Sequence, residues 1–375
     1  MVRSRLILME GLPSTGKSTN SGILLSQLER NGHRAKWVHE VARPHPTLFF
    51  YEACMEEHEY KDFITRYPHS VSILEPISMR RNNSIGIDLL EVEWNHSNQL
   101  GEDAYQQLKK YDVWNFTVDR YMKVALEKWE HFVNKQNYSD EIVILDSSLF
   151  QYQIYSLILA DVPFTQLMAF IEAIYRIISP LHPSLIYLYR EKTDDTINYL
   201  VRERGVTFLE RIWNRDKERP YYKGRPAGAE GYKMFLRDYG EYAKLLFDSA
   251  PLPKLSVEIT QGKWGEYVDL LLNFMDLSYI DPPKVVFPSG TYFNVELNQH
   301  IEIVGKYIVT PDGGRKHLEP KSDTEYYLHD LPVVIRLDEN GIIIEGEQIC
   351  DKWTTKGTVF QKVADGGQLL QHLKK

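Results

Sequence analysis

A glycine-rich loop near the N-terminus constrains the fold of this chain more than any other sequence feature. Residues 11–18 read GLPSTGKS and fit the pattern G-x-x-x-x-G-K-[ST] in full. A short apolar run, residues 5–10, precedes the loop, and residues 17–30 carry apolar side chains at helical spacing. Asn31-Gly32 then supplies a helix stop. Strand, loop and helix together predict a phosphate-binding unit.

Further strands and helices alternate over the first three quarters of the chain. The clearest strand is residues 141–146, a mostly β-branched apolar run that ends in Asp146. Because such alternation is typical of a parallel sheet covered on both faces, we expect an α/β fold, a three-layer α/β/α arrangement of the P-loop NTPase type. The other expected strands cover residues 34–39, 184–189 and 254–259, and the expected helices cover residues 118–133, 165–178, 194–204 and 232–247.

The pattern changes after Met275. Residues 281–284 read DPPK, and beyond them short β-branched runs alternate with turn sequences such as PDGG at residues 311–314. This pattern predicts a small C-terminal antiparallel β domain. The expected organisation is an α/β domain over residues 1–278, a linker at residues 279–284 and the β domain over residues 285–375.

Composition narrows the classes of partner. The net charge is −8, which argues against a surface that grips a nucleic-acid backbone. Two cysteines, Cys54 and Cys350, provide no disulfide framework. No apolar run is long enough for a signal sequence or a membrane span. We therefore expect a cytoplasmic protein that binds neither nucleic acid nor membrane, and a homodimer is left open.

The loop residues have separate electrostatic tasks. Main-chain N–H groups that curl inward, at the N-terminus of a helix, form a nest for phosphate oxygens. Lys17 is expected to reach the β- and γ-phosphates of ATP, and the Ser18 hydroxyl to bind a Mg²⁺ ion that bridges them. The alternative is a chance match in an ordinary turn, against which the flanking strand and helix argue. The expected nucleotide-binding residues are Gly11, Pro13, Ser14, Thr15, Gly16, Lys17, Ser18 and Thr19.

Asp146 is the expected partner of the loop. The carboxyl ends of parallel strands converge on the ligand crevice of a doubly wound sheet, so this carboxylate would lie near the bound phosphates. It could hold Mg²⁺ or accept a proton from the acceptor hydroxyl, and the sequence does not separate these roles. The alternative is an aspartate that caps a helix beginning near Ser147-Ser148.

On these residues the chain resembles the P-loop kinases of the thymidylate kinase and deoxynucleoside kinase group. The likeness covers residues 1–275 and rests on residues 11–19, on Glu40 and Arg43-Pro44, on residues 146–148 and on residues 185–205. The resemblance implies that Glu40 and Arg43 contact the acceptor, although their spacing is not the usual one. This sequence also differs from the family pattern at Ser147, because the family has an arginine at that position.

The resemblance further implies a lid at about residues 200–230. Arginines of such a lid offset the charge that spreads over the transferred phosphoryl group. We expect Arg202 and Arg204 to be catalytic, and a solvated basic helix face is the alternative for each. Residues 40–111 are expected to select the acceptor, with Arg80 among the acceptor-binding residues. The remaining lid candidates are Arg211, Arg215, Arg219 and Arg225.

The expected activity is ATP- and Mg²⁺-dependent phosphoryl transfer to a small molecule, such as a nucleoside, a nucleotide, a sugar-like compound or an antibiotic. Lys17 and Asp146 are the expected catalytic residues beside the lid arginines. Two alternatives stay open: an NTPase or nucleotide-driven switch without an acceptor, and a nucleotide sensor without turnover. Neither Cys54 with His58 nor His39 with His45 brings the three or four ligands that a zinc site needs.

Overall fold

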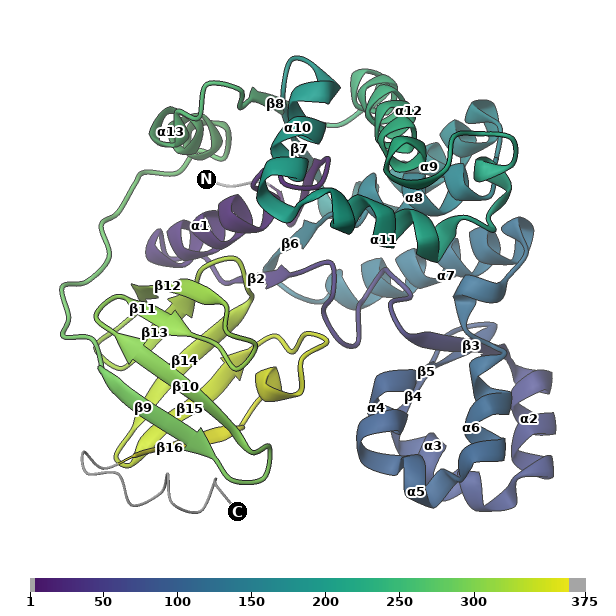
Figure 1. Cartoon of the computed structure of the whole chain (residues 1–375), viewed down its shortest axis with the longest axis horizontal. Coiled ribbons are helices and arrows are strands. Elements are labelled where there is room, and N and C mark those ends of the chain that lie inside the picture. Colours follow the sequence, from purple (N-terminus) through teal and green to yellow (C-terminus); the bar gives the residue numbers. More distant parts are fainter. Residues whose placement is uncertain (1–3, 364–375) are drawn as a thin grey trace. The chain divides into compact units, whose positions relative to one another are not determined.

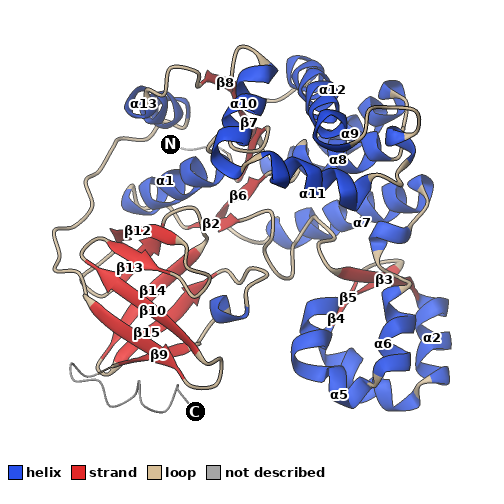
Figure 2. Cartoon of the chain, in the orientation of Figure 1, coloured by secondary structure: helices blue, strands red, loops and turns tan. Residues whose placement is uncertain are grey.

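The computed structural model describes residues 4–363 (Figures 1 and 2). It contains a five-stranded parallel sheet with helices and a closed barrel of eight antiparallel strands. Both the predicted α/β fold and the predicted C-terminal antiparallel β domain are confirmed. The described residues form two compact units: the first comprises residues 18–43 and 265–363, and the second comprises residues 4–17 and 44–264.

The parallel sheet presents the end of its central strand to the glycine-rich loop. Strand β1 (Leu6–Gly11) is buried along all its residues, which explains its continuous apolar character. Met9 of β1 pairs with Asp146, and Gly11 pairs with Leu188. The ends of two neighbouring strands therefore meet beside the loop. The strand order is β2 (Ala35–Val38), β6 (Ile142–Asp146), β1, β7 (Ser184–Tyr189) and β8 (Lys254–Glu258).

The helices of the α/β region follow the sequence pattern closely. Helix α1 (Lys17–Arg30) has the predicted bounds, and Gly32 adopts a positive φ of 84°, as a left-handed helix stop requires. The other predicted helices are present within a few residues of the expected ends: α7 (Val118–Gln136), α9 (Phe164–Ile178), α10 (Thr193–Arg204) and α12 (Gly228–Ser249). Three more are α8 (Gln151–Leu159), α11 (Val206–Asp216) and α13 (Trp264–Phe274).

An insertion follows the loop after β2 and has a core of its own. It contains a three-stranded antiparallel sheet and is otherwise mostly helical (Figure 2). Tyr60, Leu74, Ile85 and Leu108 are buried at its centre. Sequence patterns predicted a long acceptor-selecting segment here but not this sheet. Its elements are β3 (Glu52–Glu56), α2 (Glu57–Arg66), α3 (Val71–Leu74), β4 (Ser78–Arg80), β5 (Ser84–Asp88), α4 (Leu89–Glu91), α5 (Ser97–Leu100) and α6 (Glu102–Lys109).

A buried ionic cluster joins the insertion to α7. The Glu52 carboxylate forms ion pairs with Arg81 and with Lys128 of α7. Each of these side chains is at most 4% exposed. Burial raises the pKa of Glu52, but the two cations outweigh burial and hold that pKa below its usual value. The carboxylate therefore stays charged and holds two cations together inside the protein.

The C-terminal strands close into a barrel, coloured green to yellow in Figure 1. Its first and last strands pair with each other, so the barrel has no free edge. Ile301, Tyr326, Ile335 and Phe360 are among the side chains that fill its interior. Its strands are β9 (Gly290–Asn294), β10 (Gln299–Val304), β11 (Tyr307–Val309), β12 (Arg315–Pro320), β13 (Glu325–Leu328), β14 (Val333–Asp338), β15 (Gly341–Gly346) and β16 (Val359–Lys362).

Helix α1 contacts the barrel at both of its ends, and these contacts lie within the first unit. In its first turn, the Thr19 hydroxyl donates a hydrogen bond to Asp330. In its last turn, Arg30 forms an ion pair with Glu319, with 2.6 Å between Nη2 and Oε1. Although burial raises the pKa of Glu319, His329 and Arg30 hold it at about 2. The barrel and the helix after the glycine-rich loop are therefore joined by polar contacts.

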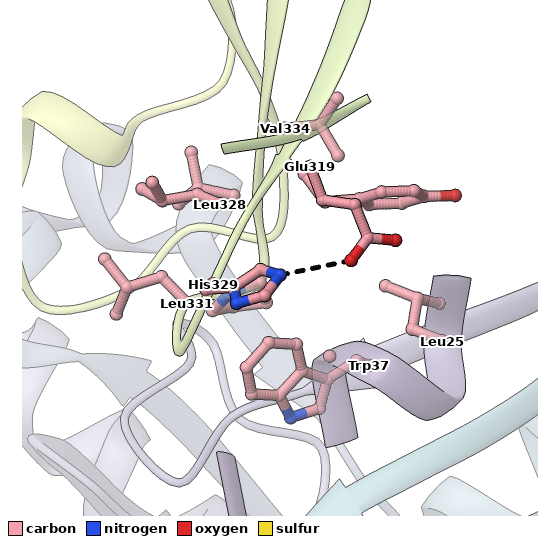
Figure 3. A pocket seen from close by; sticks show the side chains of 11 residues that line it. Leu25, Trp37, Glu319, Leu328, His329, Leu331 and Val334 are labelled. Atoms are coloured by element: carbon pink, nitrogen blue, oxygen red, sulfur yellow. Dashed lines mark hydrogen bonds and ion pairs between the residues drawn. The ribbon is translucent and has the colours of Figure 1, made fainter. Parts of the chain in front are cut away.

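A small pocket lies between α1, β2 and the barrel (Figure 3). Leu25 and Trp37 line it from α1 and β2, and His329 and Glu319 line it from the barrel, with 3.1 Å between Nε2 and Oε2. The space holds at most about one water molecule. This contact is too well filled to admit a metabolite. Within residues 4–363, none of the helices has the length and apolar character that crossing a membrane requires.

Candidate nucleotide-binding site

The backbone of the glycine-rich loop has a conformation suited to phosphate. Ser14 and Gly16 have positive φ angles of 63° and 86°, so the chain curls back on itself. Gly11 has a φ of 151°, and a Cβ there would lie 2.7 Å from Thr15 Oγ1 and closer still to the Leu188 carbonyl oxygen. Only glycine fits this position. Such a curled segment before a helix N-terminus is the geometry of an anion nest.

Lys17 lies folded over the loop. It is the first residue of α1, only 7% exposed, and its Nζ donates a hydrogen bond of 2.9 Å to the Leu12 carbonyl. The Thr15 hydroxyl donates to the same carbonyl at 2.8 Å. The positively charged ammonium group of Lys17 is thus held beside the inward face of the loop. Loop curvature, helix N-terminus and ammonium group together fit the phosphates of a nucleotide.

Asp146 stands beside the start of the loop and does not cap a helix. It is fully buried at the end of β6, beside Met9, and accepts a hydrogen bond of 2.7 Å from the Ser147 hydroxyl. Ser147 itself has a positive φ of 61°. Helix α8 begins only at Gln151, with Phe150 as its N-cap. The structure therefore gives no support to the capping alternative.

Glu10 is a site residue that sequence reasoning missed. Its fully buried carboxylate accepts hydrogen bonds from the backbone N–H groups of Leu149 (2.6 Å) and Gln151 (3.2 Å). Burial raises the pKa of Glu10 to about 7, against the lowering effect of these hydrogen bonds and of Lys17. The side chain ties the end of β1 to the loop after β6. An acidic residue at the end of an apolar strand was the signal available in the sequence.

Replacing Glu10 with glutamine should remove a pH dependence of stability. The folded-state pKa of about 7 lies above the ordinary value of 4.5, so the folded protein binds more protons than the unfolded chain between these values. The unfolding free energy of the wild type should therefore fall as pH rises from 4.5 to 7, by on the order of 3 kcal/mol. Urea unfolding at several pH values checks this, with the exposed Glu203→Gln as control. Equal slopes for wild type and Glu10→Gln would contradict it.

Two arginines share one aromatic ring near the loop. The guanidinium carbon of Arg202 lies 4.8 Å from the centre of the Tyr199 ring, and that of Arg190 lies 4.3 Å from it. Arg190 also donates a long hydrogen bond, 3.5 Å, to the Ser14 carbonyl in the loop. Burial and the neighbouring charge of Arg202 lower the pKa of Arg190. Arg190 was missed as a candidate because it precedes the expected lid helix.

The other lid candidates separate into two groups. Arg204 and Arg211 lie over the Phe208 ring at 4.9 and 5.3 Å. Three candidates instead bind protein groups: Arg215 pairs with Asp216 at 2.7 Å, Arg219 donates to the Trp114 carbonyl at 3.1 Å, and Arg225 lies 3.8 Å from Asp161. Arg202 also pairs with Glu203, but this ion pair is long, with 3.5 Å between Nε and Oε1, and the Arg202 side chain is 71% exposed. Arg202, Arg204 and Arg211 are therefore the candidates less tied to protein groups.

The expected acceptor residues lie in two different places. Glu40 and Arg43 follow β2, and the Arg43 backbone N–H donates to the Gln348 carbonyl at 2.9 Å. Arg43 is 6% exposed. Arg80 lies on β4 of the insertion, where its half-exposed side chain pairs with Glu57 (3.2 Å) and Glu75 (3.0 Å). The structure therefore keeps Glu40 and Arg43 in one loop and gives Arg80 partners within the insertion.

Both hydroxyls after Lys17 are engaged outside the loop. Ser18 Oγ lies 3.3 Å from His39 Nε2, and Thr19 donates to Asp330. In residues 4–363, no group of three or more His, Cys, Asp or Glu side chains is arranged to hold a metal ion. A magnesium ion would therefore depend on few protein ligands, which is the usual condition for a nucleotide-bound Mg²⁺.

Comparison with models of protein families and with curated proteins finds no match to this chain, so the similarity to P-loop kinases stays a resemblance of sequence motifs.

Proposed function

We propose that this chain is a kinase that transfers the γ-phosphoryl group of ATP to a small-molecule acceptor. The observation that carries the proposal is the curled loop of residues 11–16, with the buried Lys17 ammonium held over it at a helix N-terminus. Few functions other than binding polyphosphate require a cation and a ring of amides in this arrangement. The order of β1, the loop and α1 supports the same conclusion.

Each residue has a role that follows from its position. Backbone N–H groups of residues 14–18 bind the phosphate oxygens, and Lys17 neutralises charge between the β- and γ-phosphates. Ser18 and Asp146 are the proposed protein ligands of Mg²⁺, which when bound offsets the charge of the same phosphates. Arg190 and Arg202 offset the charge that grows during transfer. Asp146 is also the candidate to accept the proton of the acceptor hydroxyl.

A screen for phosphorylated products tests this proposal. The purified protein is incubated with ATP and Mg²⁺ and with pooled nucleosides, nucleotides, sugars and aminoglycoside-like compounds. A metabolite that gains ~80 Da, the mass of one phosphoryl group, together with ADP release, would identify the reaction. Nucleotide binding without turnover in every pool would contradict it.

A nucleotide-driven switch is the second candidate. The observation that favours it is the hydrogen bond between Thr19, in the first turn of α1, and Asp330 of the barrel. A movement of this turn on nucleotide binding would reach the barrel directly. Steady ATP or GTP hydrolysis without any acceptor would favour the switch over the kinase, since a kinase that excludes water turns over slowly without its acceptor.

A further inference from the structure

His39 directly follows β2, and both of its ring nitrogens are engaged. Its Nε2 is 3.3 Å from Ser18 Oγ, and its Nδ1 is 3.3 Å from the Val41 backbone nitrogen. The side chain is 9% exposed, and its ring meets the Trp37 ring edge-on, with 5.7 Å between ring centres. Three contacts from three directions thus fix the orientation of the imidazole.

These contacts determine which nitrogen of the neutral ring carries the proton. A backbone N–H can only donate, so Nδ1 must accept the hydrogen bond from Val41. The proton of the neutral imidazole is then on Nε2, which donates to Ser18 Oγ. A hydroxyl oxygen has two lone pairs, and this hydrogen bond occupies one of those of Ser18 Oγ.

We propose that His39 is a positioning residue that presents the Ser18 hydroxyl oxygen to magnesium. This inference rests on the proposed function, because it assigns a partner to the serine that would bind the ion. Because the N–H group at His39 Nε2 occupies one lone pair of Ser18 Oγ, it fixes the direction of the other lone pair. The hydroxyl oxygen is thereby oriented in advance of Mg²⁺ binding. Groups that orient a metal ligand in this way typically contribute tenfold to a hundredfold to metal affinity.

The alternative is a histidine that only fills space beside Trp37. The two roles differ in what they predict for glutamine, whose side-chain amide can place an N–H donor near the position of Nε2. A space-filling role requires only volume, whereas a positioning role requires that donor. The pair of variants His39→Ala and His39→Gln therefore separates the two.

The test measures the Mg²⁺ dependence of ATP binding directly, by calorimetry with the full chain and without any acceptor. His39→Ala should raise the Mg²⁺ concentration at half-saturation by about tenfold to a hundredfold. ATP binding in EDTA should be unchanged, and His39→Gln should recover most of the loss. Thermal unfolding of each variant shows that the fold persists.

A double-mutant cycle with Ser18→Ala gives the decisive result. If His39 acts through Ser18, adding His39→Ala to Ser18→Ala should cause no further loss of Mg²⁺ dependence. Losses that simply add, or an unchanged Mg²⁺ dependence in His39→Ala while Ser18→Ala shifts it, would overturn this inference alone. A wild-type chain that binds no ATP with or without Mg²⁺ would instead overturn the proposed function and this inference with it.

Discussion

Replacing Lys17 with alanine should lower ATP turnover by on the order of a hundredfold to a thousandfold. The ammonium group lies over the glycine-rich loop, bound to the Leu12 carbonyl, so it is already placed where the phosphates would enter. Alanine keeps the helix, since it has the highest helix propensity, but leaves the β- and γ-phosphates without this positive charge. ADP release in the presence of the acceptor and direct ATP binding would both report the loss.

Lys36→Ala is the matched control. Lys36 is 37% exposed on β2 and forms a 3.0 Å ion pair with Glu347, an arrangement that contributes little to stability. Its loss should leave turnover at the wild-type level. A Lys17→Ala variant that binds ATP and turns over like Lys36→Ala would remove the basis for assigning the loop to a nucleotide.

Replacing Glu52 with alanine should lower the unfolding free energy by about 3–5 kcal/mol. The change leaves Arg81 and Lys128 facing each other, each 2% exposed and without the carboxylate that pairs them. The site is also tightly filled, because a Cβ at Gly86 would lie 2.7 Å from Arg81 Nη2. Urea unfolding followed by circular dichroism measures the change, with hydrogen exchange to show whether the insertion opens first.

Neighbouring arginines provide the control for this cluster. Arg80→Met removes a half-exposed side chain that pairs with exposed Glu57 and Glu75, and it should cost no more than about 1 kcal/mol. Arg81→Met breaks the buried cluster and should cost severalfold more. If Glu52→Ala and Arg81→Met were as mild as Arg80→Met, the cluster would not be what holds the insertion to α7.

The local part of the fold could be predicted from the sequence. Residues 5–30 carry a strand, a loop pattern and a helix period in succession, and each depends on neighbours a few residues away. Helix α1 therefore has the predicted bounds. Asp146 was likewise marked by its place at the end of an apolar run, and the structure sets it beside Met9.

The rest depends on contacts between residues far apart in the chain, which short-range patterns do not reveal. Glu52 pairs with Lys128 across 76 positions, and β9 pairs with β16 to close the barrel. Ser18 and His39 are 21 positions apart. The sheet of the insertion escaped prediction because β3 pairs with β5, from which helices α2 and α3 and the three-residue strand β4 separate it in the sequence. The acceptor roles of Glu40, Arg43 and Arg80 stay predictions.

The polar contacts between α1 and the barrel bear on how this protein could be divided or recombined. The linker-like sequence at residues 279–284 is an obvious place to exchange the C-terminal barrel. Cutting there would nevertheless separate Arg30 from Glu319 and Glu29 from Lys321. The cut would also take the barrel residues away from the Leu25 and Trp37 side chains, which line the pocket with them, and would expose these two side chains to solvent. Helix and barrel are thus expected to be inherited together, and a functional chimera would have to take both from the same parent.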